Sequence, residues 1–295
     1  MPSAPADAAH PDTGGLFVVA TPIGNLGDLT ERARRVLAAA GVVAAEDTRR
    51  ARALLSHLGI AGKDVVRLDA NASQGDVARL AERIAAGAMV ALVTDAGTPG
   101  ISDPGSALVR AVAERGAAVV PVPGASSVVT ALSVSGFAAT AFRFVGFLPR
   151  GKKERTEVLA RIADDHDAVV FLEAPPRMAE TLDELARMMP AREAMVAREL
   201  TKVHEELLRG TLLELAEAHG GREWLGEITV VLGPYAGRGE PAADDAVLDA
   251  RIEALVAEGR RAREVAEIVS LELGLSKRTV YERVVGKKPR PGPAR

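Results

Sequence analysis

The sequence contains no cysteine, few aromatic residues and no long apolar run. Without cysteine the chain cannot form disulfides, thiolate zinc sites or cysteine nucleophiles, and it is compatible with a reducing compartment. Aromatic residues make up 3% of the 295 residues although hydrophobic residues make up 47%, so alanine, valine and leucine must build the core. This composition favours packed helices and strands of an α/β protein over an aromatic-rich β-sandwich.

Signals for a membrane or for export are also missing from the sequence. No apolar run approaches the ~20 residues that a membrane helix needs, and residues 1–14 have neither the basic start nor the apolar segment of a signal peptide. The 37 basic and 40 acidic residues give a formal net charge of −3, so nucleic-acid binding would depend on local basic patches. We expect a soluble, cytoplasmic protein with a disordered tail over residues 1–14.

The first α/β domain is predicted over residues 15–137, where short apolar runs alternate with amphipathic segments. Such alternation is typical of a parallel sheet with right-handed helical crossovers. The expected strands cover 16–21, 42–47, 65–69, 89–95 and 117–123, and the expected helices lie near 28–40, 48–58, 75–86, 104–115 and 125–135.

A second α/β domain is predicted over residues 138–236, with less regular spacing that favours a mixed sheet. Its clearest elements are strands at 168–174, 192–200 and 226–233 and a helix at 176–189. Residues 237–245 have the glycine, proline and acidic content of a linker. Residues 246–286 have the pattern of a helix-turn-helix module, with a turn at 273–275 and Ser276 as the cap of the last helix. Residues 287–295 form a basic tail.

The stretch Met89 to Gly105 carries the strongest functional signal. An apolar, β-branched run ends at Asp95, and the loop after it is rich in glycine and proline (Gly97, Pro99, Gly100, Pro104 and Gly105). Ligands of open α/β sheets bind beyond the carboxyl ends of the strands. Glycine permits close approach of a ligand to the backbone, and proline fixes the loop shape. The loop is therefore predicted to hold a small molecule.

Similar turns follow the other expected strands. In the first domain they are TPIGN (21–25), AEDTR (45–49) and PGASS (123–127), and in the second EAPPR (173–177) and ARELTK (197–202). Any one of them could be an ordinary βα loop, but four at one edge of one sheet would converge on a single crevice. The dinucleotide, P-loop, zinc-protease and serine-hydrolase motifs are absent. The five histidines are scattered, so no structural metal site is predicted.

Taken together, TPIGNLGD, AEDTR, DAGTPGISDPG, GFLPR and ARELTK resemble the bacterial 16S rRNA (cytidine-2′-O)-methyltransferase family, within the tetrapyrrole-methylase superfamily. The resemblance extends from Leu16 to Gly286. It implies a fold of two unlike α/β domains with a cleft between them, followed here by the small C-terminal helical module. It also implies S-adenosylmethionine as methyl donor, a cytidine of the decoding centre of 16S rRNA in the small ribosomal subunit as substrate, and a homodimer.

The resemblance also implies roles for individual residues. Glu46, Asp47 and Arg49 are the catalytic candidates and, with Thr48, lie on the substrate side. Two segments depart from the family pattern: LDANAS keeps only Asp69 and Asn71 of a histidine-rich segment, and Pro176 replaces a histidine. The implied cofactor-binding residues are Pro22, Asp95, Ala96, Gly97, Thr98, Ile101, Ser126, Ser127 and Glu173.

A ribose hydroxyl must lose a proton as it attacks a methyl group, and a carboxylate within hydrogen-bond reach can accept that proton. Asp47 is the first candidate, followed by Glu46 and Asp95. A Mg²⁺ ion that lowers the pKa of the hydroxyl is an alternative. Two of the acids also have structural alternatives: Asp47 could cap the helix that starts at Thr48, and Glu173 could pair with Arg177.

The C-terminal module and its tail carry a cluster of basic residues that we expect to bind rRNA phosphates, although it could instead be a solvated helix face. Two other functions remain open. A tetrapyrrole methylase, for example of a precorrin, would use the same cofactor loop, and a DNA-binding regulator would use the helix-turn-helix. The basic cluster comprises Lys277, Arg278, Arg283, Lys287, Lys288 and Arg290.

Overall fold

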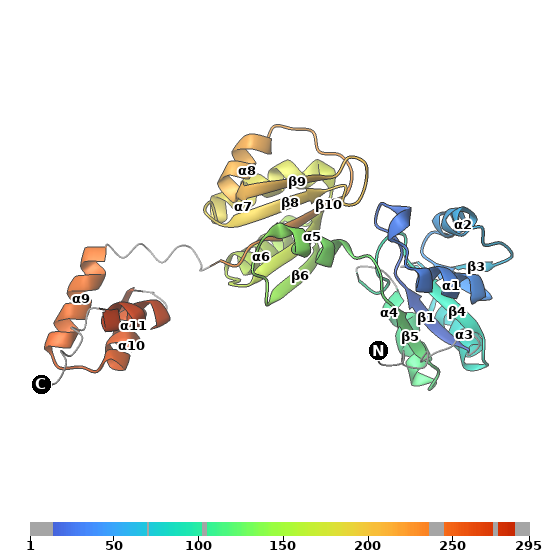
Figure 1. The fold of residues 1–295 in the computed structure, drawn as a ribbon, viewed down its shortest axis with the longest axis horizontal. Coiled ribbons are helices and arrows are strands. Elements are labelled where there is room, and N and C mark those ends of the chain that lie inside the picture. Colours follow the sequence, from blue (N-terminus) through green and yellow to red (C-terminus); the bar gives the residue numbers. More distant parts are fainter. Residues whose placement is uncertain (1–13, 70, 102–104, 236–244, 274–276, 287–295) are drawn as a thin grey trace, which may run out of the picture.

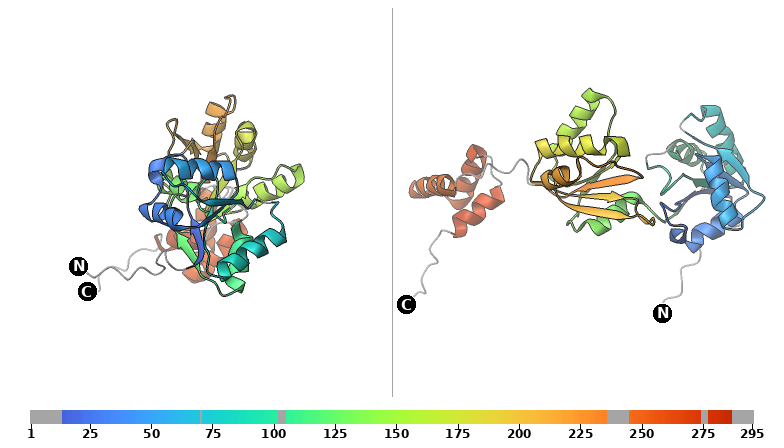
Figure 2. Two further views of the ribbon diagram at one scale, coloured as in Figure 1. Left: turned by 90° about the vertical axis from the view of Figure 1, so that its right-hand side faces the viewer. Right: turned by 90° about the horizontal axis from the view of Figure 1, so that it is seen from above.

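The computed structural model describes residues 14–69, 71–101, 105–235, 245–273 and 277–286. Two α/β domains lie next to each other, and a cluster of three helices follows them at the C-terminal end (Figures 1 and 2). The predicted linker, the turn predicted at 273–275, Ser276 and the two tails fall outside the described residues, apart from Gly14, Asp245 and Leu273 at their edges.

The first domain is built on a parallel five-stranded sheet with the strand order β3-β2-β4-β1-β5. The central strands β1, β2 and β4 are short, apolar and mostly buried, as expected for strands covered on both faces, whereas the edge strand β3 begins and ends with exposed charged residues. The strands are β1 (Gly15–Val19), β2 (Val42–Ala45), β3 (Asp64–Arg67), β4 (Met89–Val93) and β5 (Val119–Val122).

Helices cover both faces of this sheet. A short 3-10 helix, η1 (Leu26–Asp28), precedes α1 (Glu31–Ala39), which packs with α2 (Thr48–His57) on one face. On the other face lie α3 (Gln74–Ala85) and α4 (Gly105–Glu114). The chain therefore leaves β1 and β2 toward one face and leaves β4, which lies between them, toward the opposite face. Such a reversal opens a crevice at the carboxyl ends of the strands, and here it falls on both sides of β4.

The second domain is built on a mixed five-stranded sheet with the order β6-β7-β10-β8-β9, as the irregular spacing predicted. Only β6 and β7 pair in parallel, and the other neighbours are antiparallel. The strands are β6 (Phe142–Phe147), β7 (Ala168–Glu173), β8 (Glu193–Arg198), β9 (Glu206–Thr211) and β10 (Ile228–Leu232). One face is covered by α6 (Lys152–Ala163), α7 (Met178–Met188) and α8 (Leu212–His219), with the 3-10 helix η2 (Pro175–Arg177) before α7.

The opposite face of the second sheet is covered by α5 (Ser127–Ser135), which the sequence analysis assigned to the first domain. Val128 and Ala131 of α5 share a core with Val170, Met195 and Val231 of the second sheet. The structural boundary between the domains therefore precedes α5 rather than following residue 137.

The first-domain loop after β1 also contacts the second domain. Ile23 belongs to the core beneath α5, and a Cβ atom on Gly24 would lie 2.8 Å from the carbonyl oxygen of Leu200. No side chain can fit at that distance without a shift of the backbone. Glycine at position 24 therefore allows the two domains to meet.

The C-terminal module contains α9 (Asp245–Ala257), α10 (Ala262–Leu273) and α11 (Lys277–Gly286). These helices bury a small apolar core of their own that includes Ile252, Val265, Val269, Val280 and Val284. Ion pairs of Arg251 with Glu272 and of Arg283 with Asp249 lie at the edge of that core.

Candidate functional site

Three loops at the carboxyl edge of the first sheet are tied together by hydrogen bonds. Thr21, after β1, and Gly97, after β4, exchange two backbone hydrogen bonds of 2.8 and 3.0 Å. The Thr98 hydroxyl donates to the carbonyl oxygen of Ala125, after β5, at 3.1 Å. The structure therefore brings together the loops that carry most of the predicted cofactor residues.

Gly97 occupies a backbone conformation that other residues rarely adopt, with φ of 82°. An L-residue there would be strained by roughly 1–2 kcal/mol because its Cβ approaches its own carbonyl oxygen. Ser126 and Ser127 begin α5, and the Ser126 side chain makes no capping hydrogen bond. Ile101 is exposed, and Pro104 lies outside the described residues.

A polar hollow of about 460 Å³ lies at the carboxyl ends of β2, β3 and β4. Glu46, Asp47, Thr48 and Arg49, which the sequence placed on the substrate side, all line it. Asp95 lines it from the loop after β4. Three further lining residues, Arg67, Asp69 and Asn71, were not among the predicted site residues.

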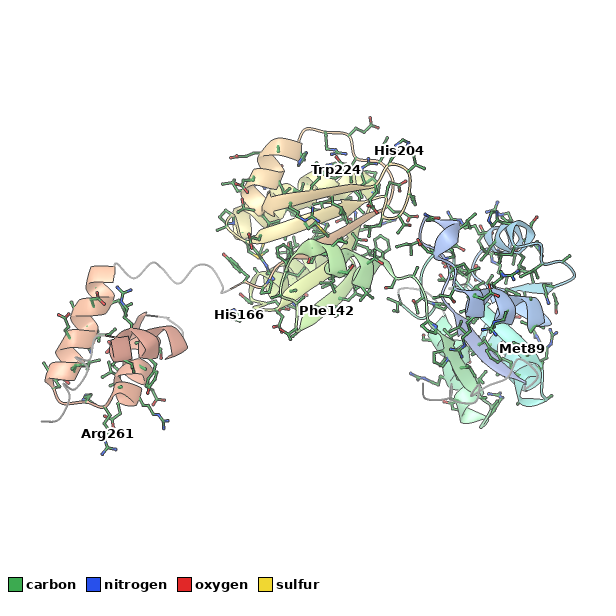
Figure 3. The ribbon with its side chains drawn as sticks, viewed as in Figure 1. Met89, Phe142, His166, His204, Trp224 and Arg261 are labelled. Carbon is green, nitrogen blue, oxygen red and sulfur yellow. The ribbon has the colours of Figure 1, made fainter. Side chains whose placement is uncertain are left out.

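A second, mostly apolar hollow of about 280 Å³ lies between the ends of β1 and β4 and helix α2. Its lining includes Pro22, Leu26, Leu54 and Val93. Asp95 also lines this hollow, so that this aspartate stands between the two. His57, which the sequence analysis counted among scattered histidines, lines it as well. Met89, labelled in Figure 3, marks the opposite end of β4.

Asp47 is the N-cap of α2, as its structural alternative predicted. Its carboxylate accepts the backbone N–H of Arg49 at 2.8 Å and pairs with the Arg49 guanidinium at 2.9 Å. These contacts, with the Arg49 side chain making the largest contribution, lower the pKa of Asp47 to about 2. A carboxylate of such low pKa is a weak proton acceptor, because general bases work best with a pKa near the operating pH.

Asp95 and Glu46 hold the neighbouring strand ends together. One carboxylate oxygen of Asp95 accepts the backbone N–H of Asp47 at 3.1 Å, and the other lies 3.5 Å from Arg50. The Thr94 hydroxyl donates to Glu46 at 3.4 Å. Both acids therefore link the loop after β2 to the loop after β4. Of the two, Asp95 lines both hollows.

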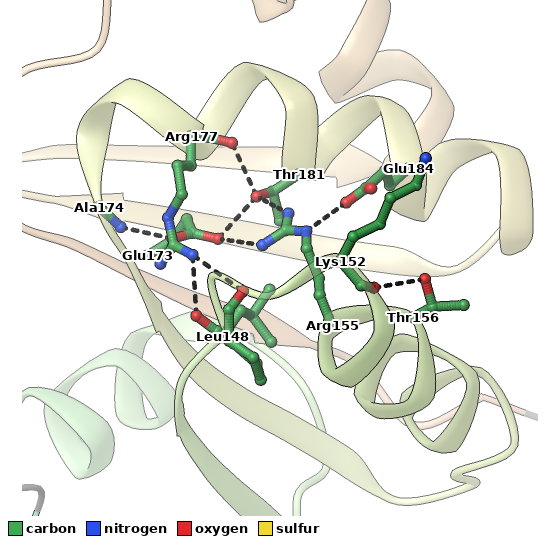
Figure 4. A network of polar contacts seen from close by, with 10 residues as sticks. Leu148, Lys152, Arg155, Thr156, Glu173, Ala174, Arg177, Thr181 and Glu184 are labelled. Atoms are coloured by element: carbon green, nitrogen blue, oxygen red, sulfur yellow. Dashed lines mark hydrogen bonds and ion pairs between the residues drawn. The ribbon is translucent and has the colours of Figure 1, made fainter.

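Glu173 lies at the end of β7 inside a buried polar network (Figure 4). Its two carboxylate oxygens contact Arg155 at 3.2 Å and Arg177 at 2.5 Å. They also accept hydrogen bonds from the Thr181 hydroxyl and from the backbone of Ala174. The pair with Arg177, which was the structural alternative, is thus present in the structure.

The same network fastens the loop that contains GFLPR. The Arg177 guanidinium donates to the carbonyl oxygens of Leu148 and Pro149 at 3.0 and 3.1 Å, as Figure 4 shows for Leu148. Arg155 extends the network to Glu184 at the surface. Two arginines and one glutamate thereby join β7, α6, α7 and the loop after β6.

The ARELTK segment has an unusual backbone. Glu199 and Thr201 have φ values of 52° and 66°, in a region that favours glycine. Lys202 pairs with Glu199 at 2.8 Å and with Glu227 at 3.2 Å, which holds the turn closed. This turn is the part of the second domain that meets Gly24.

Among the described residues, no cluster of three or more acidic or histidine side chains is arranged to bind a metal ion. The helices in the same part of the chain include none with the length and apolar character needed to span a bilayer.

Of the predicted basic cluster, Arg283 is paired with Asp249 at 3.0 Å. The side chains of Lys277 and Arg278 and all of Lys287, Lys288 and Arg290 lie outside the described part.

Residues 15–216 match the family model of the Tetrapyrrole (Corrin/Porphyrin) Methylases. The chain is 41% identical to the ribosomal RNA small subunit methyltransferase I of Halalkalibacterium halodurans, an alignment that covers 92% of this chain and 94% of that protein. It is 43% identical to the protein of the same name from Mycobacterium tuberculosis, over 96% and 99% of the two chains.

Solved structures of other methylases share the fold. A uroporphyrin-III C-methyltransferase from Thermus thermophilus, complexed with S-adenosyl homocysteine, matches with a TM-score of 0.53 and 24% identity over 75% of this chain and 97% of that one. Diphthine synthase matches with a TM-score of 0.57 and 17% identity, over 74% and 89%. The fold predicted from the sequence is thereby confirmed. The chain belongs to the tetrapyrrole methylase family, in the group of relatives named ribosomal RNA small subunit methyltransferase I.

Proposed function

We propose that this chain transfers the methyl group of S-adenosylmethionine to the ribose 2′-hydroxyl of a cytidine in the decoding centre of 16S rRNA. The observation that carries the proposal is the position of Asp95, which lines both the apolar hollow beside the predicted cofactor loop and the polar hollow beside AEDTR. The names of the relatives that cover nearly the whole chain support the same reaction class and an rRNA substrate.

The apolar hollow suits the donor chemically. Pro22, Leu26 and Val93 offer apolar contacts, and the carboxylate of Asp95 complements a cationic ligand. The backbone around Gly97 can approach a ligand closely because it has no side chain. The bound donor would supply an electrophilic methyl group on a positively charged sulfur. Of the residues predicted to hold the donor, Pro22 and Asp95 line this hollow. The others lie in the loops after β4 and β5 and are proposed to complete the donor site: Ala96, Gly97, Thr98, Ile101, Ser126 and Ser127.

The polar hollow would hold the ribose of the substrate. Methyl transfer is a direct displacement, so the main task of the chain is alignment, which can supply about 7–11 kcal/mol of the barrier. The hydroxyl proton must also go to an acceptor. We assign that acceptor to Asp95 because it lines both hollows and its ion pair with Arg50 is long, at 3.5 Å. Asp47 lines only the polar hollow, caps α2, pairs with Arg49 at 2.9 Å and has a pKa of about 2. Glu46 is the second candidate, and Asp47 and Arg49 orient the strand end.

The experiment that tests this function offers labelled S-adenosylmethionine to three substrates. These are small ribosomal subunits from a strain that lacks the enzyme, protein-free 16S rRNA, and a uroporphyrinogen-type tetrapyrrole. We expect label in the subunit or in its rRNA and none in the tetrapyrrole. Label in the tetrapyrrole alone would make the chain a tetrapyrrole methylase, and no label in any arm, together with sequence-specific duplex DNA binding, would favour a regulator.

Replacing Gly97 by alanine should weaken donor binding about tenfold. The loop relaxes away from its left-handed conformation in the free protein, and binding must restore it at a cost of roughly 1–2 kcal/mol. Calorimetry with S-adenosylhomocysteine measures the change. The matched control is Gly116→Ala, since Gly116 has φ of 69° at the end of α4 with open space around it. This variant should lose stability but bind the donor normally; equal affinities of both variants would contradict the assignment of the loop.

Replacing Asp47 by asparagine should lower the methyl-transfer rate less than about tenfold, well short of the 10²–10⁴-fold expected for loss of a general base. Asparagine still caps α2, and only the charge opposite Arg49 is lost. With a pKa of about 2 the Asp47 carboxylate stays ionised throughout the neutral range. The pH–rate profile should therefore keep its shape in the variant. A flattened profile and a loss of a hundredfold or more would restore Asp47 as the proton acceptor.

The C-terminal module is proposed to add rRNA affinity through its basic residues outside the described part, while Arg283 serves the core of the module. A chain that ends at residue 241 should retain donor binding and lose rRNA affinity, because phosphate contacts supply most of the non-specific binding energy. Filter binding at fixed salt measures this, and unchanged rRNA affinity would refute it.

A homodimer and a cytoplasmic location, where ribosomal subunits are modified, belong to the same proposal.

A further inference from the structure

Three arginines pair with three aspartates at the carboxyl edge of the first sheet, Asp47, Asp69 and Asp95, which we name the acidic floor. Arg49 and Arg50 lie in the first turn of α2, and Arg67 is the last residue of β3. Each is paired with a different aspartate: Arg49 with Asp47 at 2.9 Å, Arg50 with Asp95 at 3.5 Å, and Arg67 with Asp69 at 2.5 Å. We name these three side chains the arginine rim.

The pairs share one orientation, with the acid inside and the cation outside. The side chains of Arg49, Arg50 and Arg67 are 88%, 62% and 71% exposed, whereas those of Asp47, Asp95 and Asp69 are 27%, 31% and 15% exposed. A guanidinium has five N–H donors, and one carboxylate occupies only some of them. The remaining donors of the rim are therefore available to solvent or to an incoming anion.

The local backbone adds to this preference for an anion. Cations in the first turn of a helix are disfavoured by its dipole, and an anion near that end is stabilised. The first turn of α2 carries two arginines, Arg49 and Arg50, and the acid at this end of the helix is the N-cap Asp47, which pairs with Arg49. Ion pairs between exposed side chains contribute little to folding. Folding stability therefore gains little from three exposed arginines at this edge, and their free donors suit an anion from outside.

We propose that the arginine rim binds the phosphates on either side of the target nucleotide, while the acidic floor receives its ribose. This inference rests on the proposed function and adds which residues read the RNA backbone. Arginine suits this task because its planar fork can bind two phosphate oxygens at once. The aspartates hold the guanidiniums in place before binding, so that less side-chain freedom is lost on binding.

The test measures binding of protein-free 16S rRNA and of small subunits at increasing salt, without methyl transfer. The variant Arg49→Ala/Arg67→Ala should bind more weakly, and the slope of log affinity against log salt should fall by about 0.7–0.9 for each phosphate that the variant no longer binds. Donor affinity should stay unchanged. Arg67→Lys should keep most of the slope because it keeps the charge.

The matched control is Arg79→Ala, which removes an equally exposed arginine paired with Asp76 on α3, outside both hollows. It should leave the slope unchanged. An unchanged slope in the double variant would contradict phosphate binding by the arginine rim, even if methylation fell. An equal fall of the slope in Arg79→Ala would contradict it as well, because the loss of any exposed positive charge would then have the same effect. If the wild-type chain binds rRNA without methylating it, the proposed function is wrong. The change of slope in the double variant then still shows whether the arginine rim binds phosphates.

Discussion

Replacing Glu173 by alanine should lower the free energy of unfolding by about 3–5 kcal/mol, the usual result when one partner of a buried ion pair is removed. Glu173 is buried, and its carboxylate is the counter-charge for both Arg155 and Arg177. Without it, the buried Arg155 keeps Glu184 as its counter-charge, and the Arg177 guanidinium loses the carboxylate with which it pairs. Urea unfolding measures the change.

Glu184→Ala is the control for this effect. It removes the partly exposed partner of Arg155 and leaves Glu173 in place, so we expect a loss below about 1 kcal/mol. Similar losses in both variants would contradict the buried network as described. Glu173→Gln addresses the cofactor role predicted from the sequence: unchanged donor affinity in the folded variant supports the structural role, and an affinity about tenfold lower would support a contact with the donor.

Replacing Asp95 by asparagine should reduce methyl transfer about 10²–10⁴-fold, the range for loss of a positioned general base. Asparagine has nearly the same shape and can still accept the backbone N–H of Asp47, so the strand ends should stay in place. The loss would then report on the charge and proton affinity of the carboxylate. Single-turnover rates at saturating donor and subunit measure the change.

Asp64→Asn is the matched control for Asp95. Asp64 begins β3, at the opposite edge of the same sheet, and forms an exposed ion pair with Arg83. Its replacement should leave the rate within about twofold, since exposed pairs contribute little. A rate for Asp95→Asn within tenfold of the wild type would contradict its role as proton acceptor and favour Glu46.

The elements of the first domain were predictable because each strand contains a short apolar stretch with a glycine or an acid nearby, and in β3 that stretch is only Val65 and Val66. The predicted runs 42–47 and 89–95 contain β2 and β4, and each continues beyond the last paired residue. The predicted strands extend too far because the apolar runs lead directly into Asp47 and Asp95. In the structure these two residues hydrogen-bond to polar groups of the loops and do not pair with a neighbouring strand.

The second domain was predictable only in part. No element was predicted between residues 200 and 226, yet this stretch contains β9 and α8. β9 is an edge strand that pairs only with β8, and its half-buried sequence ELLRGT lacks a clear alternation. Helix α5 was assigned to the wrong domain because its neighbours in sequence belong to the first sheet, whereas Val128 and Ala131 pack on the second.

The candidate site was also predictable only in part. Convergence of Asp47, Asp95 and Gly97 followed from the rule that carboxyl ends of parallel strands share an edge. The participation of Arg67 and Asp69 did not, because it depends on β3 lying beside β2, and strand order cannot be read from spacing alone. The low pKa of Asp47 likewise depends on the rotamer of Arg49.

The central claim is that this chain methylates a ribose hydroxyl of 16S rRNA through a site at the carboxyl edge of the first sheet. The most direct measurement is nucleoside analysis of 16S rRNA after small subunits that lack the modification have been incubated with the protein and labelled S-adenosylmethionine. We predict a single labelled 2′-O-methylcytidine from the decoding centre with the wild-type chain and almost none with Asp95→Asn. Label on a base, on another nucleoside, or undiminished in the variant would contradict this account.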